Sequence, residues 1–133
     1  MILHLRKDGM LPVGIHQTTL AELFAAFPAR NQQRQILNDS LQQVVVALRT
    51  LDIRIKIYID GSYITNKAEP NDIDLLLVTP HHTEPAIWRY LNHICPVEAV
   101  SCGIYVEASF PNRVFALYTM TRAGVAKGII HLV

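Results

Sequence analysis

Two short groups of residues in the middle of the chain have the types and the spacing for phosphate chemistry. Gly61-Ser62 is followed, after the nine residues 63–71, by Asp72-Ile73-Asp74. Glycine lets the backbone approach a phosphate closely, and a serine that opens a helical turn adds a hydroxyl to backbone N–H donors. Two carboxylates attract a divalent cation. The combination predicts a site for a nucleotide triphosphate and its metal ions.

The two aspartates are expected to face the same way. Asp72 and Asp74 are two residues apart at the start of an apolar strand, and strand side chains alternate between faces. Their like charges repel and favour protonation unless a cation neutralises them. Mg²⁺ takes oxygen ligands and is often shared between carboxylates and substrate phosphates, and two such ions can serve one site. The expected cofactor is therefore Mg²⁺, and the expected substrate is a nucleotide triphosphate.

The spacing of Gly61-Ser62 and Asp72-Ile73-Asp74 resembles the signature of the polymerase-beta-like nucleotidyltransferase superfamily. The resemblance covers about residues 31–78, because a long helix before the first strand also suits that fold. More loosely, the whole chain is similar to a family of small, largely uncharacterised bacterial nucleotidyltransferase-like proteins. That likeness rests on the segments Leu11-Pro-Val-Gly-Ile-His-Gln-Thr-Thr-Leu-Ala-Glu-Leu, Ile59-Asp-Gly-Ser-Tyr-Ile-Thr and Arg122-Ala-Gly-Val-Ala-Lys-Gly-Ile-Ile.

The superfamily resemblance implies Mg²⁺-dependent transfer of a nucleoside monophosphate to a hydroxyl acceptor, and it leaves the base and the acceptor open. Active members usually place a third acidic residue on a later strand. Glu107 is the first candidate, as metal ligand or as base for the acceptor hydroxyl. Glu98 is the alternative. If neither carboxylate reaches the site, nucleotide binding is expected to persist without catalysis.

Three cations are candidates for phosphate binding. Lys67 lies between the two halves of the motif, and Arg122 and Lys127 flank a turn that contains Gly124. The alternative for each is a solvated surface charge. Asp60, directly before Gly61, is expected to cap the following turn rather than to bind a metal.

The elements that must position these groups follow from hydrophobic periodicity and from turn residues. Residues 1–17 are expected to form a surface arm. The expected helices are 18–27, 31–50 with Gln32, Arg34, Asp39 and Gln43 on the polar face, and one that begins at residues 83–85. The expected strands are 53–59, 72–78, 101–110 and 128–133, and residues 113–120 are ambiguous, with a strand favoured. This pattern indicates an α+β or α/β fold. The resemblance makes it a minimal nucleotidyltransferase fold, with a mixed sheet covered by helices on one side.

Length and composition set the remaining expectations. A chain of 133 residues is expected to form a single nucleotidyltransferase-like domain over 1–133. Its net charge of +1 gives no clear nucleic-acid patch, and no apolar run reaches the roughly 20 residues that span a bilayer. Cys95 and Cys102 make no disulfide framework, which favours a cytoplasmic protein.

Three functions compete at this point. The first is an active nucleotidyltransferase. The second is a catalytically weak or inactive binding or regulatory module that works with a protein partner, as an antitoxin does in toxin–antitoxin pairs. The third is a self-associating homo-oligomer with a vestigial site, because apolar strands leave an open sheet edge.

Overall fold

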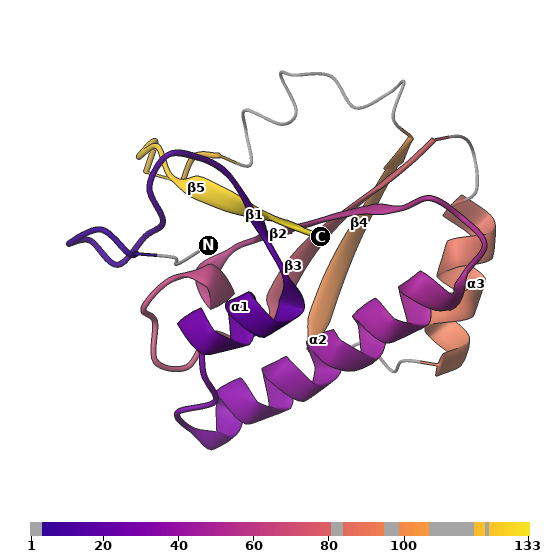
Figure 1. Cartoon of the computed structure of the whole chain (residues 1–133), viewed down its shortest axis with the longest axis horizontal. Coiled ribbons are helices and arrows are strands. Elements are labelled where there is room, and N and C mark those ends of the chain that lie inside the picture. The colour runs from indigo at the N-terminus through magenta and orange to yellow at the C-terminus, as the bar shows by residue number, and fades with distance from the viewer. Residues whose placement is uncertain (1–3, 81–83, 95–98, 107–118, 122) are drawn as a thin grey trace.

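The computed structural model describes residues 4–80, 84–94, 99–106, 119–121 and 123–133 (Figure 1). In chain order its elements are β1 (Gly14–Thr18), α1 (Leu20–Ala26), α2 (Gln32–Thr50), β2 (Lys56–Asp60), the 3-10 turn η1 (Ser62–Ile64), β3 (Ile73–Thr79), α3 (Glu84–Ile94), β4 (Val100–Val106) and β5 (Gly128–Leu132).

The strands form one mixed sheet in the order β1-β5-β2-β3-β4. The central strand β2 is antiparallel to both of its neighbours, β3 and β5. Each outer pair, β1 with β5 and β3 with β4, is parallel. Helices and a mixed sheet together confirm the α+β class predicted from the sequence.

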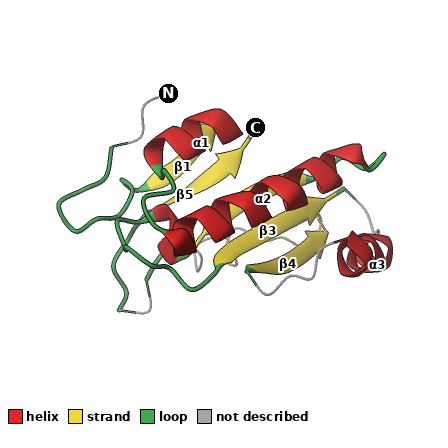
Figure 2. Cartoon of the chain, turned by 90° about the horizontal axis from the view of Figure 1, so that it is seen from below, coloured by secondary structure: helices red, strands yellow, loops and turns green. Residues whose placement is uncertain are grey.

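One face of the sheet carries the core, and α1 and α2 cover that face (Figure 2). Alternation along β2 directs Ile57 and Ile59 toward these helices, whereas Tyr58 and Asp60 point to the opposite face. Helix α2 packs its apolar stripe against the strands. The buried residues of that stripe are Leu37, Leu41, Val44, Val45 and Leu48.

Both N-terminal helices start where their capping residues predict. Thr19 and Glu22 form a capping box at α1, in which each side chain accepts from the other residue's backbone N–H. Asn31 caps α2 by accepting from the backbone N–H of Arg34 at 2.8 Å. These local hydrogen bonds fix the first residues of the helices, Leu20 and Gln32, within two residues of the starts predicted at 18 and 31.

The predicted N-terminal arm is partly wrong. Residues 14–17 belong to β1, a short edge strand whose ladder runs from Gly14↔Gly128 to Thr18↔Leu132. This strand pairs in parallel with β5, more than a hundred residues later in the chain. No local sequence pattern predicts such a pairing. The final strand predicted over 128–133 is confirmed as β5.

The middle strands are shorter or shifted relative to the prediction. β2 begins at Lys56, which pairs with Val78, so Ile53 and Ile55 precede the ladder although both pack on the core. β3 begins at Ile73 rather than at Asp72. Strand β4 ends at Val106, and the predicted continuation over 107–110 lies outside the described residues, as does most of the ambiguous segment 113–120.

Within the part of the chain that the structure describes, no helix is both long enough and apolar enough to cross a bilayer. The longest of these helices, α2, has one apolar stripe and one polar side rather than an apolar surface all round. Helix α2 crosses the sheet from the α1 side to the segment that leads into β2 (Figure 1).

Candidate functional site

Gly61 connects the end of β2 to η1 in a backbone conformation that suits glycine alone. Its φ is 82° and its ψ is −169°, a region that other residues enter only at considerable cost. A Cβ added at Gly61 would lie 3.1 Å from Cγ of Asp74 and still closer to its Oδ2. Both the backbone angle and the neighbouring carboxylate therefore require glycine at this position.

Asp60 and Asp74 lie directly opposite each other on β2 and β3. On its other side Asp74 is opposite Ser101 of β4, so the three residues form a row across three adjacent strands. All three line a cavity of about 320 Å³ on the face opposite α2. Because like charges on directly opposed residues repel, this pair of carboxylates favours a cation nearby.

Lys127 is one such cation. Its Nζ donates a hydrogen bond to Oδ1 of Asp60, and the two side chains are 10% and 11% exposed. Burial lowers the pKa of Lys127 to about 8, while the hydrogen bond to a carboxylate favours its charged form. Lys127 thus neutralises one of the two opposed carboxylates from the turn that precedes β5.

Ser62 opens η1, as the sequence predicts, and lies beside a second cavity of about 370 Å³. Asp60, Gly61 and Lys127 also line this cavity, and Asp60 is the residue that it shares with the first cavity. Thr65 closes the turn by donating its backbone N–H and its hydroxyl to the carbonyl of Ser62, at 3.2 and 2.6 Å. The Ser62 hydroxyl is the closest side-chain donor to Gly61 along the chain.

Arg34 of α2 fixes this turn by hydrogen bonds to its carbonyl groups. Its guanidinium is fully buried and donates to the carbonyls of Tyr63 (3.0 Å), Thr65 (2.9 Å) and Lys67 (2.6 Å). It also lies over the rings of Phe27 and Tyr63, 5.8 and 5.4 Å from their centroids. The prediction that Arg34 lies on the polar face of its helix is wrong, because its fork of donors satisfies three carbonyls that the turn would otherwise leave without partners.

Asn38, one turn further along α2, completes this support. It accepts a 2.6 Å hydrogen bond from the hydroxyl of Tyr63 and donates to the carbonyl of Phe27 at 3.2 Å. Burial raises the pKa of Tyr63, so the phenol stays protonated and keeps donating. The loop 62–67 is therefore fixed to a rigid helix rather than left to the solvent.

The structure brings together some of the predicted site residues and separates others. Gly61, Ser62, Asp74 and Lys127 gather at the end of β2. Asp72 is half buried but lies outside both cavities, because it precedes β3. The side chain of Lys67 is exposed in the loop. Glu107, Glu98 and Arg122 lie outside the described residues.

The prediction that Asp60 caps the turn is wrong. The cap position belongs to Gly61, and the Asp60 carboxylate faces Lys127 instead. Ser101, which β4 places beside Asp74, was not among the predicted site residues. Strand alternation was the available signal for Asp60, since Ile57 and Ile59 had to face the core and Asp60 therefore the other side.

The carboxylates at this site are possible ligands for a metal ion. Among the described residues no group of three or more His, Cys, Asp and Glu side chains is arranged to hold one. The opposed carboxylates of Asp60 and Asp74 are two oxygen ligands, which suits Mg²⁺ because this ion usually completes its shell with phosphates and water. The residues present therefore fit a metal that arrives with a phosphorylated ligand.

Comparisons with known proteins identify a family and no function. No curated protein matches the chain, and no solved structure matches it. A family model described as "Family of unknown function (DUF6932)" matches residues 3–133, which is nearly the whole chain. The protein therefore belongs to the DUF6932 family.

Proposed function

We propose that this protein is a Mg²⁺-dependent nucleotidyltransferase with a minimal nucleotidyltransferase fold, as its resemblance to the polymerase-beta-like superfamily implies. The observation that carries the proposal is the contact between Gly61 and Asp74. It brings a glycine turn, whose main chain a phosphate can approach, next to a carboxylate suited to that phosphate's metal. Ser62 and Lys127 add a hydroxyl donor and a cation at the same end of the sheet.

Asp74 would hold Mg²⁺ together with Asp60 or Asp72, and the bound ion would supply charge neutralisation for the triphosphate. The chain's own groups bind and orient the nucleotide. The backbone at Gly61 approaches the phosphates, the Ser62 hydroxyl donates to a phosphate oxygen, and Lys127 offsets negative charge. The rigid support from Arg34 keeps this loop in one geometry, which matters because catalysis depends on positioning.

In the proposed reaction an acceptor hydroxyl oxygen forms a bond to the α-phosphorus of the nucleotide. The bond between that phosphorus and the bridging oxygen breaks, and pyrophosphate leaves with its electron pair. The hydroxyl proton passes to a carboxylate, and the superfamily resemblance implies Glu107 for this role. The products are a nucleotidylated acceptor and pyrophosphate.

A transfer assay tests the reaction. Nucleotides labelled at the α-phosphate are incubated with the protein, Mg²⁺ and a cell extract that supplies acceptors. Label is expected to reach a macromolecule or small molecule in the presence of the wild-type protein, and not with Asp74→Asn. Equal labelling by the wild type and by Asp74→Asn, or no labelling with any of the four nucleotides, contradicts the proposed transfer.

One observation favours a second candidate, a nucleotide-binding regulatory module without turnover. Among the described residues no group of three His, Cys, Asp or Glu side chains is arranged to hold a metal ion, and Lys127 already neutralises Asp60. Such a module would act through a protein partner, as in a toxin–antitoxin pair, or as a homo-oligomer. A partner that co-purifies at fixed stoichiometry with wild type and with Asp74→Asn supports this candidate, whereas label transfer that depends on Asp74 excludes it.

A further inference from the structure

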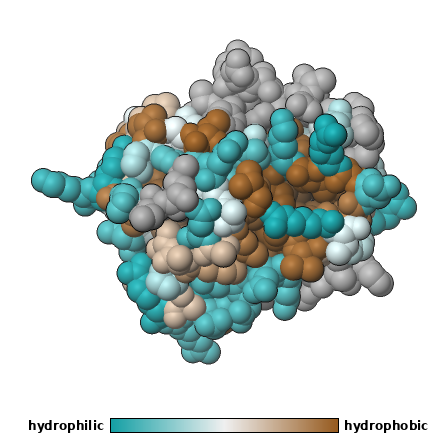
Figure 3. Space-filling model, in the orientation of Figure 1, coloured by the Kyte–Doolittle hydropathy of each residue, from teal (hydrophilic) through white to brown (hydrophobic). Residues whose placement is uncertain are grey.

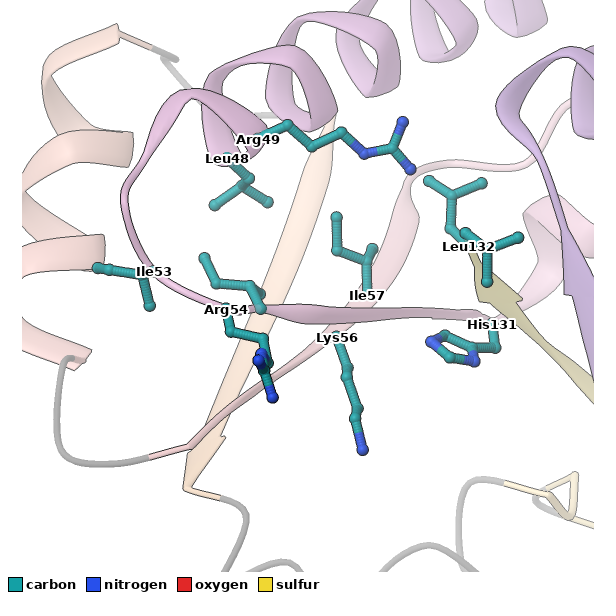
Figure 4. Close-up of a pocket in the computed structure, with 10 residues that line it drawn as sticks. Leu48, Arg49, Ile53, Arg54, Lys56, Ile57, His131 and Leu132 are labelled. Carbon is teal, nitrogen blue, oxygen red and sulfur yellow. The ribbon is translucent and has the colours of Figure 1, made fainter.

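A cavity of about 400 Å³ lies at the start of β2, and its polar and apolar groups lie on different sides of the strand. Figure 3 shows apolar residues gathered in a hollow right of centre. In the close-up of Figure 4, Leu48, Ile57 and Leu132 lie on the helix side of the β2 ribbon, whereas Arg54 lies on the other side. Beside the apolar floor there remains one exposed cation, Arg49, which does not define a class of ligand.

The cavity beside Ser62 differs, because polar and apolar groups line it together. This Ser62 cavity shares Asp60 with the neighbouring Asp74 cavity, which contains both opposed carboxylates. Most of the surface of the Ser62 cavity is apolar. Its lining residues are Met10, Asp60, Gly61, Ser62, Thr65, Met120, Thr121 and Lys127. Apolar walls with a few fixed polar groups are the usual composition of a small-molecule site.

The first apolar wall of the Ser62 cavity is Met10, from the N-terminal arm. Backbone hydrogen bonds hold the arm on both sides of this residue. The carbonyl of Gly9 accepts from the backbone N–H of Asn66 at 3.0 Å, and the carbonyl of Leu11 accepts from the backbone N–H of Gly128 at 3.1 Å. The first bond ties the arm to the loop 62–67, and the second ties it to β5. Met10 is therefore placed at the cavity by the fold, although it comes from the arm.

The second apolar wall is Met120, from the turn that precedes β5. Met120 pairs with Ala126 in a short antiparallel bridge, and the backbone N–H of Lys127 donates to the carbonyl of Thr119 at 2.8 Å. The guanidinium of Arg6 donates to the carbonyl of Ala126 at 2.8 Å, which ties this turn to the arm. Met120 is 46% exposed, so a ligand in the cavity would remove apolar surface from water.

The two neighbouring cavities match the two ends of a nucleotide. Asp60 and Asp74 line the Asp74 cavity, where a metal ion and its phosphates would offset their charge. Gly61 contacts Asp74 and lines the Ser62 cavity, so phosphates bound at Gly61 would lie between the two cavities. From that position the rest of the nucleotide can extend toward the methionines. The thioether sulfur of methionine makes favourable contacts with aromatic rings.

We propose that the Ser62 cavity binds the nucleobase of the nucleotide, with the side chains of Met10 and Met120 against its ring. The inference rests on the proposed function, because phosphates at Gly61 are what direct the base into this cavity. The volume of about 370 Å³ falls within the range of about 300–1,000 Å³ typical of small-ligand pockets. The base is then bound by two segments of the chain that lie outside the motif of Gly61 and Asp74.

Methionine methyl groups report the position of the base, because an aromatic ring shifts the NMR signals of methyl groups beside it. The chain has three methionines, Met1, Met10 and Met120, and the variants Met10→Leu and Met120→Leu assign their signals. The full chain, labelled with ¹³C at these methyl groups, is titrated with each of the four nucleoside triphosphates and with inorganic tripolyphosphate, all at millimolar Mg²⁺. At least one nucleotide is expected to shift the Met10 and Met120 signals well beyond the shift caused by tripolyphosphate, which has no ring.

The affinities separate the contribution of the base from that of the phosphates. The Met10→Ala/Met120→Ala variant is expected to bind that nucleotide about tenfold more weakly, because it loses two contacts between sulfur and an aromatic ring. It should bind tripolyphosphate as the wild type does, which also shows that the variant is folded. Val46→Ala removes an exposed apolar side chain from α2 and should change neither affinity.

Three results would overturn the inference and leave the metal-triphosphate site standing. In the first, nucleotides and tripolyphosphate shift the two methionine signals equally. In the second, the double variant binds the nucleotide with the affinity of the wild type. In the third, it loses nucleotide and tripolyphosphate affinity by the same factor, which would assign the methionines to the phosphate end. No binding of either ligand by the wild type would instead contradict the proposed function, and the inference with it.

Discussion

The carboxylate of Asp74 lies against the backbone of Gly61, in the place where a Cβ of any other residue would be. The two residues are separated by the turn η1 and a polar loop, and the antiparallel pairing of β2 with β3 brings them together. This contact joins the two halves of the motif into one site. Gly61 is therefore constrained twice, by its positive φ and by its contact with Asp74. Substitutions can separate these two constraints.

Gly61→Ala is expected to lower the free energy of unfolding and to displace the Asp74 carboxylate. The positive φ costs an alanine about 1–3 kcal/mol, and the collision with Asp74 adds to it. Gly124→Ala is the matched control, because Gly124 has φ of 80° and nothing within 4 Å of a Cβ. Urea unfolding should show a larger loss for Gly61→Ala. Equal losses would mean that Asp74 imposes no constraint on this position.

Lys127→Met is expected to destabilise the protein by about 3–5 kcal/mol, because it leaves the buried Asp60 carboxylate without its cation. The double variant Asp60→Asn/Lys127→Met removes both charges and should recover part of that loss. The free energies of unfolding of the wild type, both single variants and the double variant give the coupling. Additive losses would show that the two side chains do not interact in solution.

Arg34→Lys should destabilise the loop 62–67 although it keeps the charge. An ammonium has no planar fork, so it cannot donate to the carbonyls of Tyr63, Thr65 and Lys67 in the same geometry. Two or three lost hydrogen bonds to a charged group predict a loss of several kcal/mol, about 2–4. Arg30→Lys, at an exposed position near the same helix, is the control. Faster hydrogen exchange confined to residues 62–67 would identify the loop as the region that loosens.

The stability of the protein is expected to fall in acid partly through His131. Its pKa is lowered from 6.5 by burial and by Lys56, so the unfolded chain binds the proton more readily. The contribution of neutral His131 is therefore complete above pH 6.5 and is lost as the pH falls through the lower folded pKa. Lys56→Gln should raise that pKa in an NMR titration, and Lys67→Gln should not. An unchanged pKa in Lys56→Gln would contradict the electrostatic cause.

The parts of this fold that could be predicted from the sequence are those with local signals. The caps at Thr19 and Asn31 and the stripe of α2 lie within a few residues of the helices they define. The strand that ends at Asp60 and the turn at Ser62 are also local. In the site, Gly61 and Asp74 were predicted together because a short motif contains both.

The rest depends on contacts that link distant parts of the chain. Lys127 and Asp60 are 67 residues apart, and no pattern near either residue indicates the other. Arg34 looks like a surface residue until the carbonyls of the loop, about 30 residues later, are placed above it. β1 needs β5 beside it to be a strand. Such pairings are decided by the tertiary fold and not by local propensity.

Calorimetry of nucleotide binding tests the central claim most directly. Each of the four nucleoside triphosphates is titrated into the full chain at millimolar Mg²⁺ and again with the metal chelated. The account predicts Mg²⁺-dependent binding of at least one nucleotide, lost in Asp74→Ala and kept in Asp39→Ala, which changes an exposed carboxylate on α2. Binding that is absent for all four nucleotides, or equal in Asp74→Ala and wild type, would contradict a metal-triphosphate site at Gly61 and Asp74.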